Sequence, residues 1–220
     1  TFYDIYNQFI IDVPEYINNA FKENKKIVFE GAQGTLLDID HGTYPFVTSS
    51  NTTVGGIFTG SGVSPKNLNY ILAIVKAYTT RVGSGPFMTE LFDNDGKHLS
   101  EKGHEFGATT GRERRCGWLD LVALKRSIII NGFTGICLTK IDVLDELKTI
   151  KVCINYENNK PVYKCFDGWQ KNISKIKKYE DLPENTKIYI EAIEEFLSVP
   201  IDIVSNGPGR DQNIYRNDII

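Results

Sequence analysis

The chain has 220 residues, of which 41% are hydrophobic, so it can bury one sizeable core or one core with a small lobe. Its 25 Lys and Arg residues against 28 Asp and Glu residues leave a net charge of -3, which argues against a bulk electrostatic attraction to nucleic acid or an anionic membrane. No apolar run approaches the roughly 18 residues of a membrane span, and the N-terminus has no secretion-signal pattern. We expect a cytoplasmic protein with no membrane or nucleic-acid partner, in which any anion site is local.

The four cysteines are spaced too widely for a metal clamp or a disulfide framework, and we expect reduced, mostly buried thiols at Cys116, Cys137, Cys153 and Cys165. The three histidines do not fall at helical spacing, so the sequence predicts no metal site in this chain. The first residue is Thr rather than Met, which is compatible with a piece of a longer protein.

Residues 1–24 carry apolar positions at helical spacing and predict two helical segments divided at Asp12. Residues 27–30 predict a short buried strand that runs into a Gly-rich turn at 31–35, where α/β proteins place ligand sites. A long polar, Gly-rich stretch follows over 38–62, and its interleaved aromatic residues predict an ordered functional loop. The alternative is that its hydroxyls only satisfy buried backbone groups.

The pair Ser64-Pro65 has the pattern of a helix start, and the apolar stripe over 68–78 predicts a core helix. Residues 87–92 predict a short strand, and the polar residues 93–96 predict a turn.

The stretch 107–115 (Gly-Ala-Thr-Thr-Gly-Arg-Glu-Arg-Arg) combines two glycines, two threonines and three arginines. Arginine presents planar donors that match carboxylate and phosphate oxygens, and glycine lets the backbone approach a ligand closely. The stretch predicts an anion-binding loop, with an exposed basic turn as the alternative. An apolar helix predicted over 118–131, stopped by Gly132, would add its N-terminal dipole to the attraction for anions.

A second buried strand at 135–138 delivers Thr139-Lys140-Ile141-Asp142 at its carboxyl end. This pattern resembles the guanine-reading element of GTP-binding proteins, because a carboxylate can accept from both N1–H and the 2-amino group of guanine. An ordinary loop that happens to hold a Lys and an Asp is the alternative.

Residues 148–167 alternate as a β-hairpin, and a helix around 187–197 precedes a last strand at 200–204, which ends in the small-residue turn 205–210. The predicted fold class is α/β: a central, mainly parallel sheet flanked by helices, with a small β-hairpin lobe and ligand loops at the carboxyl ends of the strands. No linker or repeat divides the sequence, so we expect residues 1–220 to form a single domain.

Four segments, in this order, resemble adenylosuccinate synthetase across the later half of that enzyme: Phe29 to Thr53, Gly107 to Arg112, Leu138 to Asp142 and Ile203 to Pro208. That family couples GTP to the joining of IMP and L-aspartate through a 6-phosphoryl-IMP intermediate, giving adenylosuccinate, GDP and phosphate. The resemblance implies IMP, L-aspartate and GTP as ligands, Mg2+ as a cofactor and a homodimer.

Carried over by position, the resemblance implies three groups of ligand-binding residues. The IMP group is Gln33, Thr48, Val82 and Arg112. The aspartate loop is Ala108, Thr109, Thr110, Gly111, Arg112, Glu113 and Arg114, with Arg114 also reaching the GTP phosphates. The guanine base is framed by Lys140, Ile141, Asp142, Ser205, Asn206 and Gly207.

The family's phosphate loop, its catalytic Asp and His, and the Arg that crosses its dimer interface belong to the N-terminal half, and none of them is in this sequence. We therefore assign no certain catalytic residue to this chain and expect magnesium ligands mainly outside it. Three alternatives stay open: a purine-nucleotide-binding fragment without chemistry, a regulatory GTPase, and a basic-loop nucleic-acid binder. The absent phosphate loop disfavours the second, and the net acidity disfavours the third.

Overall fold

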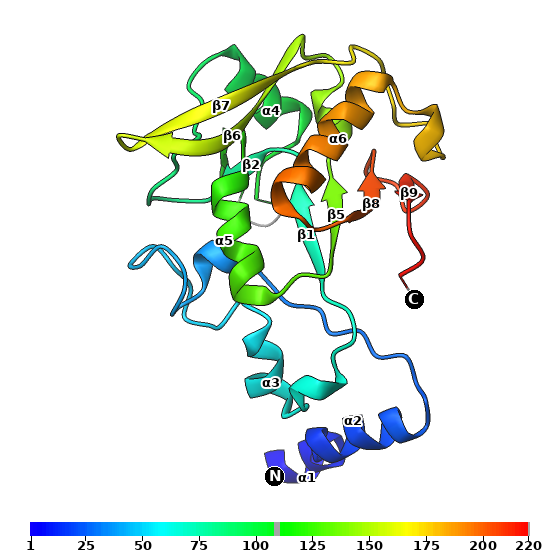
Figure 1. The fold of residues 1–220 in the computed structure, drawn as a ribbon. Coiled ribbons are helices and arrows are strands. Elements are labelled where there is room, and N and C mark those ends of the chain that lie inside the picture. Colours follow the sequence, from blue (N-terminus) through cyan, green and yellow to red (C-terminus); the bar gives the residue numbers. More distant parts are fainter. Residues whose placement is uncertain (108–110, 220) are drawn as a thin grey trace. The chain divides into compact units, whose positions relative to one another are not determined.

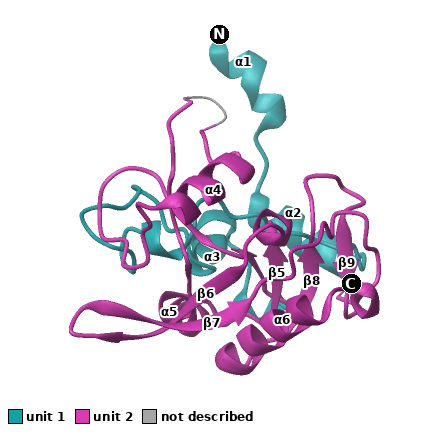
Figure 2. Cartoon of the chain, turned by 90° about the horizontal axis from the view of Figure 1, so that it is seen from above, with its two compact units in different colours: residues 1–69 teal, residues 70–220 magenta. Residues whose placement is uncertain are grey.

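The structure is a computed structural model that describes residues 1–107 and 111–219. The chain divides into two compact units, Thr1–Asn69 and Tyr70–Ile220, which Figure 2 shows in different colours. Among the described residues, no helix is long and apolar enough to cross a membrane.

Unit 1 (Thr1–Asn69) consists of short helices joined by long loops. Its α-helices are α1 (Phe2–Tyr6), α2 (Val13–Lys22) and α3 (Gly55–Ser61), and its 3-10 turns are Asn7–Phe9, Thr35–Leu37 and Pro65–Asn67. Helix α2 begins where the sequence predicts a break, because the Asp12 carboxylate accepts a hydrogen bond from the Glu15 N–H. The strand predicted over 27–30 is wrong: unit 1 contains no strand to pair with it, and Val28 is 86% exposed.

Unit 2 (Tyr70–Ile220) is built on the predicted, mainly parallel sheet (Figure 1). Strands β1 (Leu72–Lys76), β5 (Gly135–Thr139) and β8 (Ile201–Ser205) run parallel, and β9 (Asn213–Tyr215) pairs antiparallel with β8. Strand β5 lies in the middle and its side chains are buried on both faces, as expected for a parallel strand covered by helices.

Helices cover the sheet of unit 2, as the predicted α/β class requires. These are α4 (Asn94–Lys102), α5 (Leu121–Asn131) and α6 (Glu184–Leu197). Figure 2 shows α5 and α6 on one side of the sheet and α4 on the other. The core joins Ile136 and Leu138 of β5 to Ile190 and Ile193 of α6, all with exposed fractions of 1% or less.

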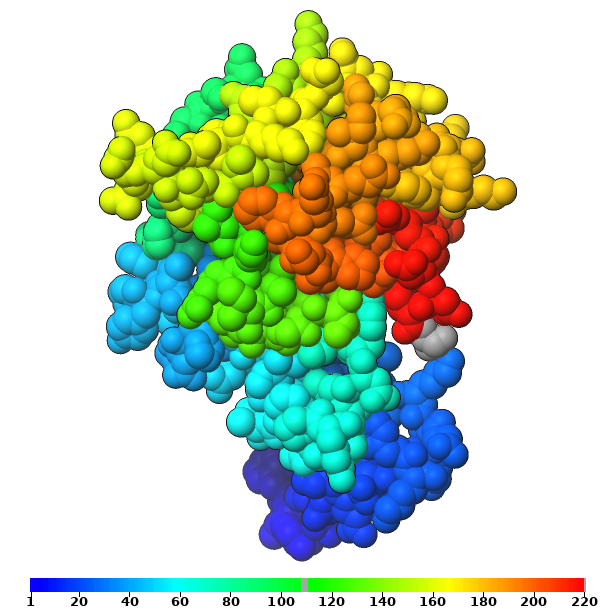
Figure 3. Space-filling model, viewed as in Figure 1, coloured from blue at the N-terminus to red at the C-terminus, as the bar shows by residue number. Residues whose placement is uncertain are grey.

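The predicted hairpin is confirmed as β6 (Thr149–Glu157) and β7 (Lys160–Asp167), which turn through Asn158 and Asn159 at positive φ. Strand β4 (Leu119–Asp120) pairs parallel with β6, and β2 (Thr79–Arg81) forms a separate antiparallel pair with β3 (Arg115–Gly117). In the space-filling view of Figure 3, the hairpin (yellow) and α6 (orange) form one continuous surface.

The helix predicted over 68–78 is wrong. Ser64-Pro65 starts only a single 3-10 turn, and Leu72–Lys76 is strand β1. The apolar spacing fits a helix equally well, but the run Leu-Ala-Ile-Val is also what a parallel strand needs, and pairing with β5 decides between the two.

Two further boundaries differ from the sequence prediction. The segment 87–92, predicted as a strand, contains only an isolated bridge from Glu90 to Gly117. The residues 93–96, predicted as a turn, begin helix α4, and Asp93 is its N-cap, which accepts from the Gly96 N–H. Helix α5 begins at Leu121 rather than 118, because Asp120 caps it and the preceding two residues pair as strand β4. Its end at Gly132, with φ 64°, is as predicted.

Candidate functional site

The carboxyl ends of three parallel strands meet at one edge of the sheet in unit 2. Strand β1 ends at Lys76, β5 is followed by Lys140, and β8 ends at Ser205. Neighbouring residues pair in register, Lys76 with Thr139 and Leu138 with Val204, so the three ends lie side by side. In open α/β sheets this edge is where ligands bind.

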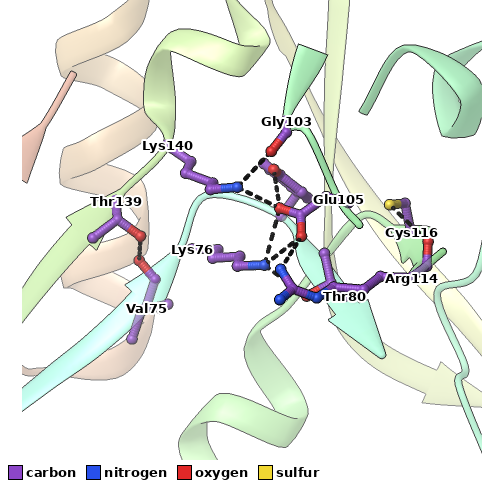
Figure 4. A network of polar contacts seen from close by, with 10 residues as sticks. Val75, Lys76, Thr80, Gly103, Glu105, Arg114, Cys116, Thr139 and Lys140 are labelled. Atoms are coloured by element: carbon purple, nitrogen blue, oxygen red, sulfur yellow. Dashed lines mark hydrogen bonds and ion pairs between the residues drawn. The ribbon is translucent and has the colours of Figure 1, made fainter. Parts of the chain in front are cut away.

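A fully buried carboxylate, Glu105, lies at this edge among three cations (Figure 4). Its Oε1 accepts from Lys140 Nζ at 2.7 Å, from Tyr78 Oη at 2.6 Å and from Lys76 Nζ at 2.9 Å. Its Oε2 accepts from Arg114 Nη1 at 2.8 Å and again from Lys76 Nζ at 2.9 Å. The two oxygens therefore have a full set of partners.

The electrostatics of this cluster favour an added anion. Burial raises the pKa of Glu105, but the hydrogen bonds from Lys140, Tyr78, Lys76 and Arg114 prevail and lower it to about 2. Glu105 is thus ionised, and three cations against one carboxylate leave two positive charges unbalanced within the cluster. The side chains of Lys76, Arg114 and Lys140 are 28%, 31% and 34% exposed, whereas that of Glu105 is 0% exposed. The surplus charge is therefore accessible.

Burial also acts on two of the groups that contact Glu105. It lowers the pKa of the Lys76 ammonium, although Glu105 opposes the shift. It raises the pKa of the Tyr78 hydroxyl, and the bond to Glu105 adds to that effect, so Tyr78 stays a donor at neutral pH.

The predicted anion loop starts from a stem that includes Glu105. The Arg114 N–H donates to the Glu105 carbonyl at 2.9 Å, and Phe106 bridges Glu113 in the same antiparallel sense. The Gly107 N–H donates to the Arg112 carbonyl at 2.8 Å, and Gly111 has φ 62°, which suits glycine. The predicted loop residues Ala108, Thr109 and Thr110 lie outside the described residues.

The Arg112 side chain lies against the segment that carries Val82. A methyl group built on Gly83 would lie 3.8 Å from Arg112 Nη2. Arg115 fixes the same segment, because its guanidinium binds the Glu90 carboxylate and donates to the carbonyls of Gly83 and Gly85 at 3.1 and 3.0 Å. The Arg112 guanidinium, predicted for IMP, thus lies near Gly83, the residue that follows Val82.

The predicted guanine element follows β5 as a tight turn. Lys140 has φ 58°, and its Nζ also donates to the Gly103 carbonyl at 2.6 Å. Asp142 is half-buried in the 3-10 turn Ile141–Leu144, and burial raises its pKa. Its carboxylate accepts a hydrogen bond from its own backbone N–H and is attracted by the Lys140 ammonium.

A buried carboxylate ties this turn to the chain beyond the hairpin. Asp145 Oδ1 accepts from Trp169 Nε1 at 2.7 Å, and Oδ2 accepts from the Ile173 N–H at 3.1 Å. Burial outweighs these two bonds and raises the pKa of Asp145 to about 6. Asn206 binds the same segment, because its Nδ2 donates to the carbonyls of Ile173 and Ile176 at 2.6 and 2.9 Å.

The turn after β8 completes this side of the edge. Asn206 is fully buried, and its Oδ1 has no hydrogen-bond partner within the described part of the chain. Gly207 lies so close to the Gln212 side chain that any added methyl group would collide with it. Ser205 and Gly207 thus form a compact turn one strand away from Lys140.

The other two residues predicted for IMP, Gln33 and Thr48, belong to unit 1. Gln33 is exposed with φ 63°, and Thr48 Oγ1 pairs with Ser50 Oγ at 2.9 Å. Their loop is organised by the fully buried Asp38, which accepts from the backbone N–H groups of Asp40, His41, Thr52 and Thr53. Although burial raises the pKa of Asp38, these bonds prevail and lower it.

The sequence prediction missed Lys76 and Glu105, the two residues that complete the cation cluster. Lys76 was hidden by the wrong helix prediction over 68–78. Glu105 lies two residues before the predicted loop, and an acidic residue near three arginines is a signal for an ion pair. Its contacts to Lys76 and Lys140 cannot be predicted without the three-dimensional fold.

The comparisons with known proteins agree on one family. A family model described as adenylosuccinate synthetase matches residues 1–214. The chain is 54% identical to the adenylosuccinate synthetase of Alcanivorax borkumensis over 94% of this chain and 52% of that one. It is 56% identical to that of Buchnera aphidicola subsp. Schizaphis graminum over 96% of this chain and 53% of that one.

Among solved structures, a fully ligated adenylosuccinate synthetase from Plasmodium falciparum matches with a TM-score of 0.93 and 45% identity, covering 96% of this chain and 55% of that chain. The chain thus spans about half the length of the curated relatives it matches. On the family match, the identities and the shared fold, it belongs to the adenylosuccinate synthetase family.

Proposed function

We propose that these 220 residues form the later half of an enzyme that joins IMP and L-aspartate at the expense of GTP. In this reaction the γ-phosphate of GTP moves to the 6-oxygen of IMP, and the aspartate amine then displaces phosphate from the 6-phosphoryl-IMP intermediate. The products are adenylosuccinate, GDP and phosphate. The reaction is a ligation in purine biosynthesis.

The observation that carries the proposal is the cluster around Glu105. Three strand and loop segments bring Lys76, Arg114 and Lys140 to the carboxyl edge of a parallel sheet, with two unbalanced positive charges that are partly exposed. Aspartate brings two carboxylates and GTP brings phosphates, so both are suited to this edge. Cations already fixed in place stabilise the charge that develops on a transferred phosphoryl group.

We assign aspartate to the loop that holds Gly111, Arg112, Glu113 and Arg114, together with the three residues outside the described part. The two guanidiniums supply forked donors for its carboxylates. Arg114 also reaches the GTP phosphates, and this dual role fits its place beside Lys140 on Glu105.

The guanine base is assigned to the edge formed by the turns after β5 and β8, with Lys140, Ile141, Asp142, Ser205, Asn206 and Gly207. The Asp142 carboxylate accepts from N1–H and the 2-amino group, a pair of donors that adenine lacks. The half-buried position of this carboxylate supports the assignment, because a hydrogen bond from a ligand is stronger there than at an exposed site.

IMP is assigned to Gln33, Thr48, Val82 and Arg112. The position of the Arg112 guanidinium near Gly83, the residue after Val82, supports a shared role for the last two. The family also implies a homodimer and a cytoplasmic enzyme, and both are part of the proposal.

Magnesium does not fit the described residues. The described part of the chain contains no group of three or more His, Cys, Asp or Glu side chains that could hold a metal ion. At the cluster itself, both oxygens of Glu105 are already occupied by donors. The proposal therefore leaves the ligands of Mg2+ to chain outside these residues and assigns no step through the ion to this chain.

Two measurements test the proposal. The full-length polypeptide that carries these residues is expected to form adenylosuccinate from IMP, aspartate and GTP, whereas the 220-residue chain alone is expected to bind nucleotide without turnover. Turnover at an ordinary enzymatic rate by the chain alone would refute its role as one half.

In the full-length protein, GTP is expected to bind more tightly than ATP, and Asp142→Asn to weaken GTP about tenfold or more through the loss of a charged acceptor. The same exchange at the exposed Asp181 is the matched control and should leave GTP affinity unchanged. Equal affinity for GTP and ATP would remove the guanine assignment.

A further inference from the structure

We propose that Glu105 is a positioning residue that couples the aspartate loop to the guanine element, so that one buried carboxylate sets the affinity for both substrates. The inference rests on the proposed function, because it assigns a role within the same site. It extends that function to a residue that need not touch any substrate.

Glu105 is unsuited to contacting a ligand itself. Its side chain is 0% exposed, and its two oxygens accept five hydrogen bonds from four side chains: Lys76, Tyr78, Arg114 and Lys140. A carboxylate held in this way has no free lone pair for a substrate donor or a metal ion, and its lowered pKa removes it as a proton carrier near neutrality. Any functional effect must therefore pass through its partners.

Two of these partners come from different ligand elements. Arg114 belongs to the proposed aspartate loop, and Lys140 belongs to the proposed guanine turn. They bind opposite oxygens of the same carboxylate, Arg114 on Oε2 and Lys140 on Oε1. The separation of the guanidinium and the ammonium is consequently fixed by the width of one carboxyl group (Figure 4).

The carboxylate is itself anchored from two directions. Its own backbone forms the loop stem, where its carbonyl accepts from the Arg114 N–H at 2.9 Å. Lys76 at the end of β1 contacts both oxygens, and its Nζ also donates to Thr80 Oγ1 at 2.8 Å. The loop stem, strand β1 and the turn after β5 are thus joined at a single point.

Removing the charge of Glu105 would leave three cations at close range without their counter-ion. Their mutual repulsion in a partly buried site would push the Arg114 and Lys140 side chains apart, toward solvent. The aspartate side and the guanine side should then weaken together. The five bonds described at the Glu105 carboxylate come from Lys76, Tyr78, Arg114 and Lys140, which are not assigned to IMP, so IMP binding should change least.

The test uses the full-length protein and compares Glu105→Gln, Glu105→Asp and the wild type by steady-state kinetics. Glu105→Gln, which keeps the size and removes the charge, is expected to raise KM for aspartate and KM for GTP each about tenfold or more, and KM for IMP less than about threefold. Glu105→Asp keeps the charge and shortens the reach, so both KM values should rise together by a smaller factor. Glu101→Gln on the exposed face of α4 is the matched control.

The pattern of KM values separates positioning from a merely structural role. Loss of structure alone lowers the active fraction, which reduces kcat and leaves all three KM values unchanged, and this result would overturn the inference. A rise in only one of the two KM values would overturn it as well. If Glu105→Gln does not fold, Glu105→Asp decides by the same criterion.

A double-mutant cycle gives an independent measurement. Arg114→Leu and Lys140→Leu should affect GTP affinity non-additively in the wild type and additively in the Glu105→Asp background, since the link between them is weakened there. Additive effects in both backgrounds count against coupling. If the unmutated full-length protein forms no adenylosuccinate, the proposed function fails; if it is active and Glu105→Gln matches it, only this inference fails.

Discussion

Each unit of the molecule has a polar loop organised by one fully buried carboxylate, and the two carboxylates differ in their partners. Asp38 in unit 1 accepts from four backbone N–H groups of its own loop. Glu105 in unit 2 accepts from four side chains, three of them cationic, which come from β1, the loop stem and the end of β5. Burial opposes ionisation of both, and in both the hydrogen bonds prevail and lower the pKa.

The difference separates a carboxylate that holds a loop from one that holds partly exposed cationic side chains. The donors to Asp38 are amides that stay with the fold, so this carboxylate fixes the shape of the loop whether or not a ligand is present. The donors to Glu105 include the side chains of Arg114 and Lys140, which are 31% and 34% exposed, so this carboxylate fixes cationic groups that a ligand can reach. Changes at the first should affect stability, and changes around the second should affect affinity and rate.

The largest effect is expected for Arg114→Leu in the full-length protein. On the proposed role of Arg114, the substitution removes one charged donor from the developing charge, and kcat/KM for aspartate should fall by roughly 100- to 1000-fold. IMP affinity should change far less, and stability should fall only slightly, because Glu105 keeps three other donors. Steady-state kinetics with each substrate varied, together with urea unfolding, measures both.

Arg126→Leu, on the exposed surface of α5, is the matched control for Arg114 and should leave all kinetic constants within about twofold of the wild type. If Arg114→Leu affects only IMP binding, the loop is misassigned. The expectation that changes around Glu105 affect aspartate use would then be wrong.

Asp38→Asn is expected to have the next largest effect, this time on stability. The amide retains one acceptor oxygen but turns N–H groups toward the backbone donors, so the free energy of unfolding should fall by about 2–4 kcal/mol. The ratio of GTP to ATP affinity should not change. Denaturant unfolding and nucleotide titration of the same samples measure the two quantities.

Asp40→Asn makes the same exchange two residues away, at an exposed side chain that accepts from Asn51 Nδ2, and should cost less than about 1 kcal/mol. Equal losses at Asp38 and Asp40 would contradict the role given to the buried carboxylate.

The smallest effect is predicted for a third buried carboxylate, Asp145. It has only two donors, and its pKa is raised to about 6. Between pH 4 and pH 6 the folded state keeps a proton that the unfolded state releases, so the free energy of unfolding should fall as the pH rises, by roughly 2 kcal/mol. Asp145→Asn should lack this fall, and Asp167→Asn, at an exposed position, should retain it.

The measurement is the difference in unfolding free energy between the wild type and Asp145→Asn at several pH values. A difference that stays constant between pH 4 and pH 6 would show that two neutral donors suffice to keep this carboxylate ionised. The contrast with the four-donor carboxylates would then be lost.

Much of the fold could be predicted from the sequence where local signals are decisive. The hairpin, strands β5 and β8, and the end of α5 at Gly132 follow from alternation, apolar runs and turn residues. Strand β1 could not be predicted, because its apolar spacing fits a helix and only the pairing with β5 selects a strand. Segment 27–30 failed for the opposite reason, since an apolar run without a partner strand has nowhere to form its hydrogen bonds.

The candidate site also combines residues that local patterns predict with residues that only long-range contacts bring in. The arginine loop and the Lys140 turn are local patterns and are visible in the sequence, and the structure brings Arg114 and Lys140 to one point. The carboxylate that joins them is not visible in this way, because Glu105 finds Lys76 at a sequence separation of 29 and Lys140 at one of 35. Long-range contacts of this kind follow from sheet topology and not from composition.

The glycine that ends α4 has a consequence for how this region tolerates change. Gly103 has an ordinary φ of -75°, so its backbone does not demand glycine, yet a methyl group there would overlap the hydroxyl of Tyr78. The same residue offers its carbonyl to Lys140 Nζ. A single added carbon at position 103 would therefore dislodge two of the Glu105 contacts without removing any charge. Laboratory selection for activity should retain glycine at this position more strictly than its exposed neighbours Lys102 and His104.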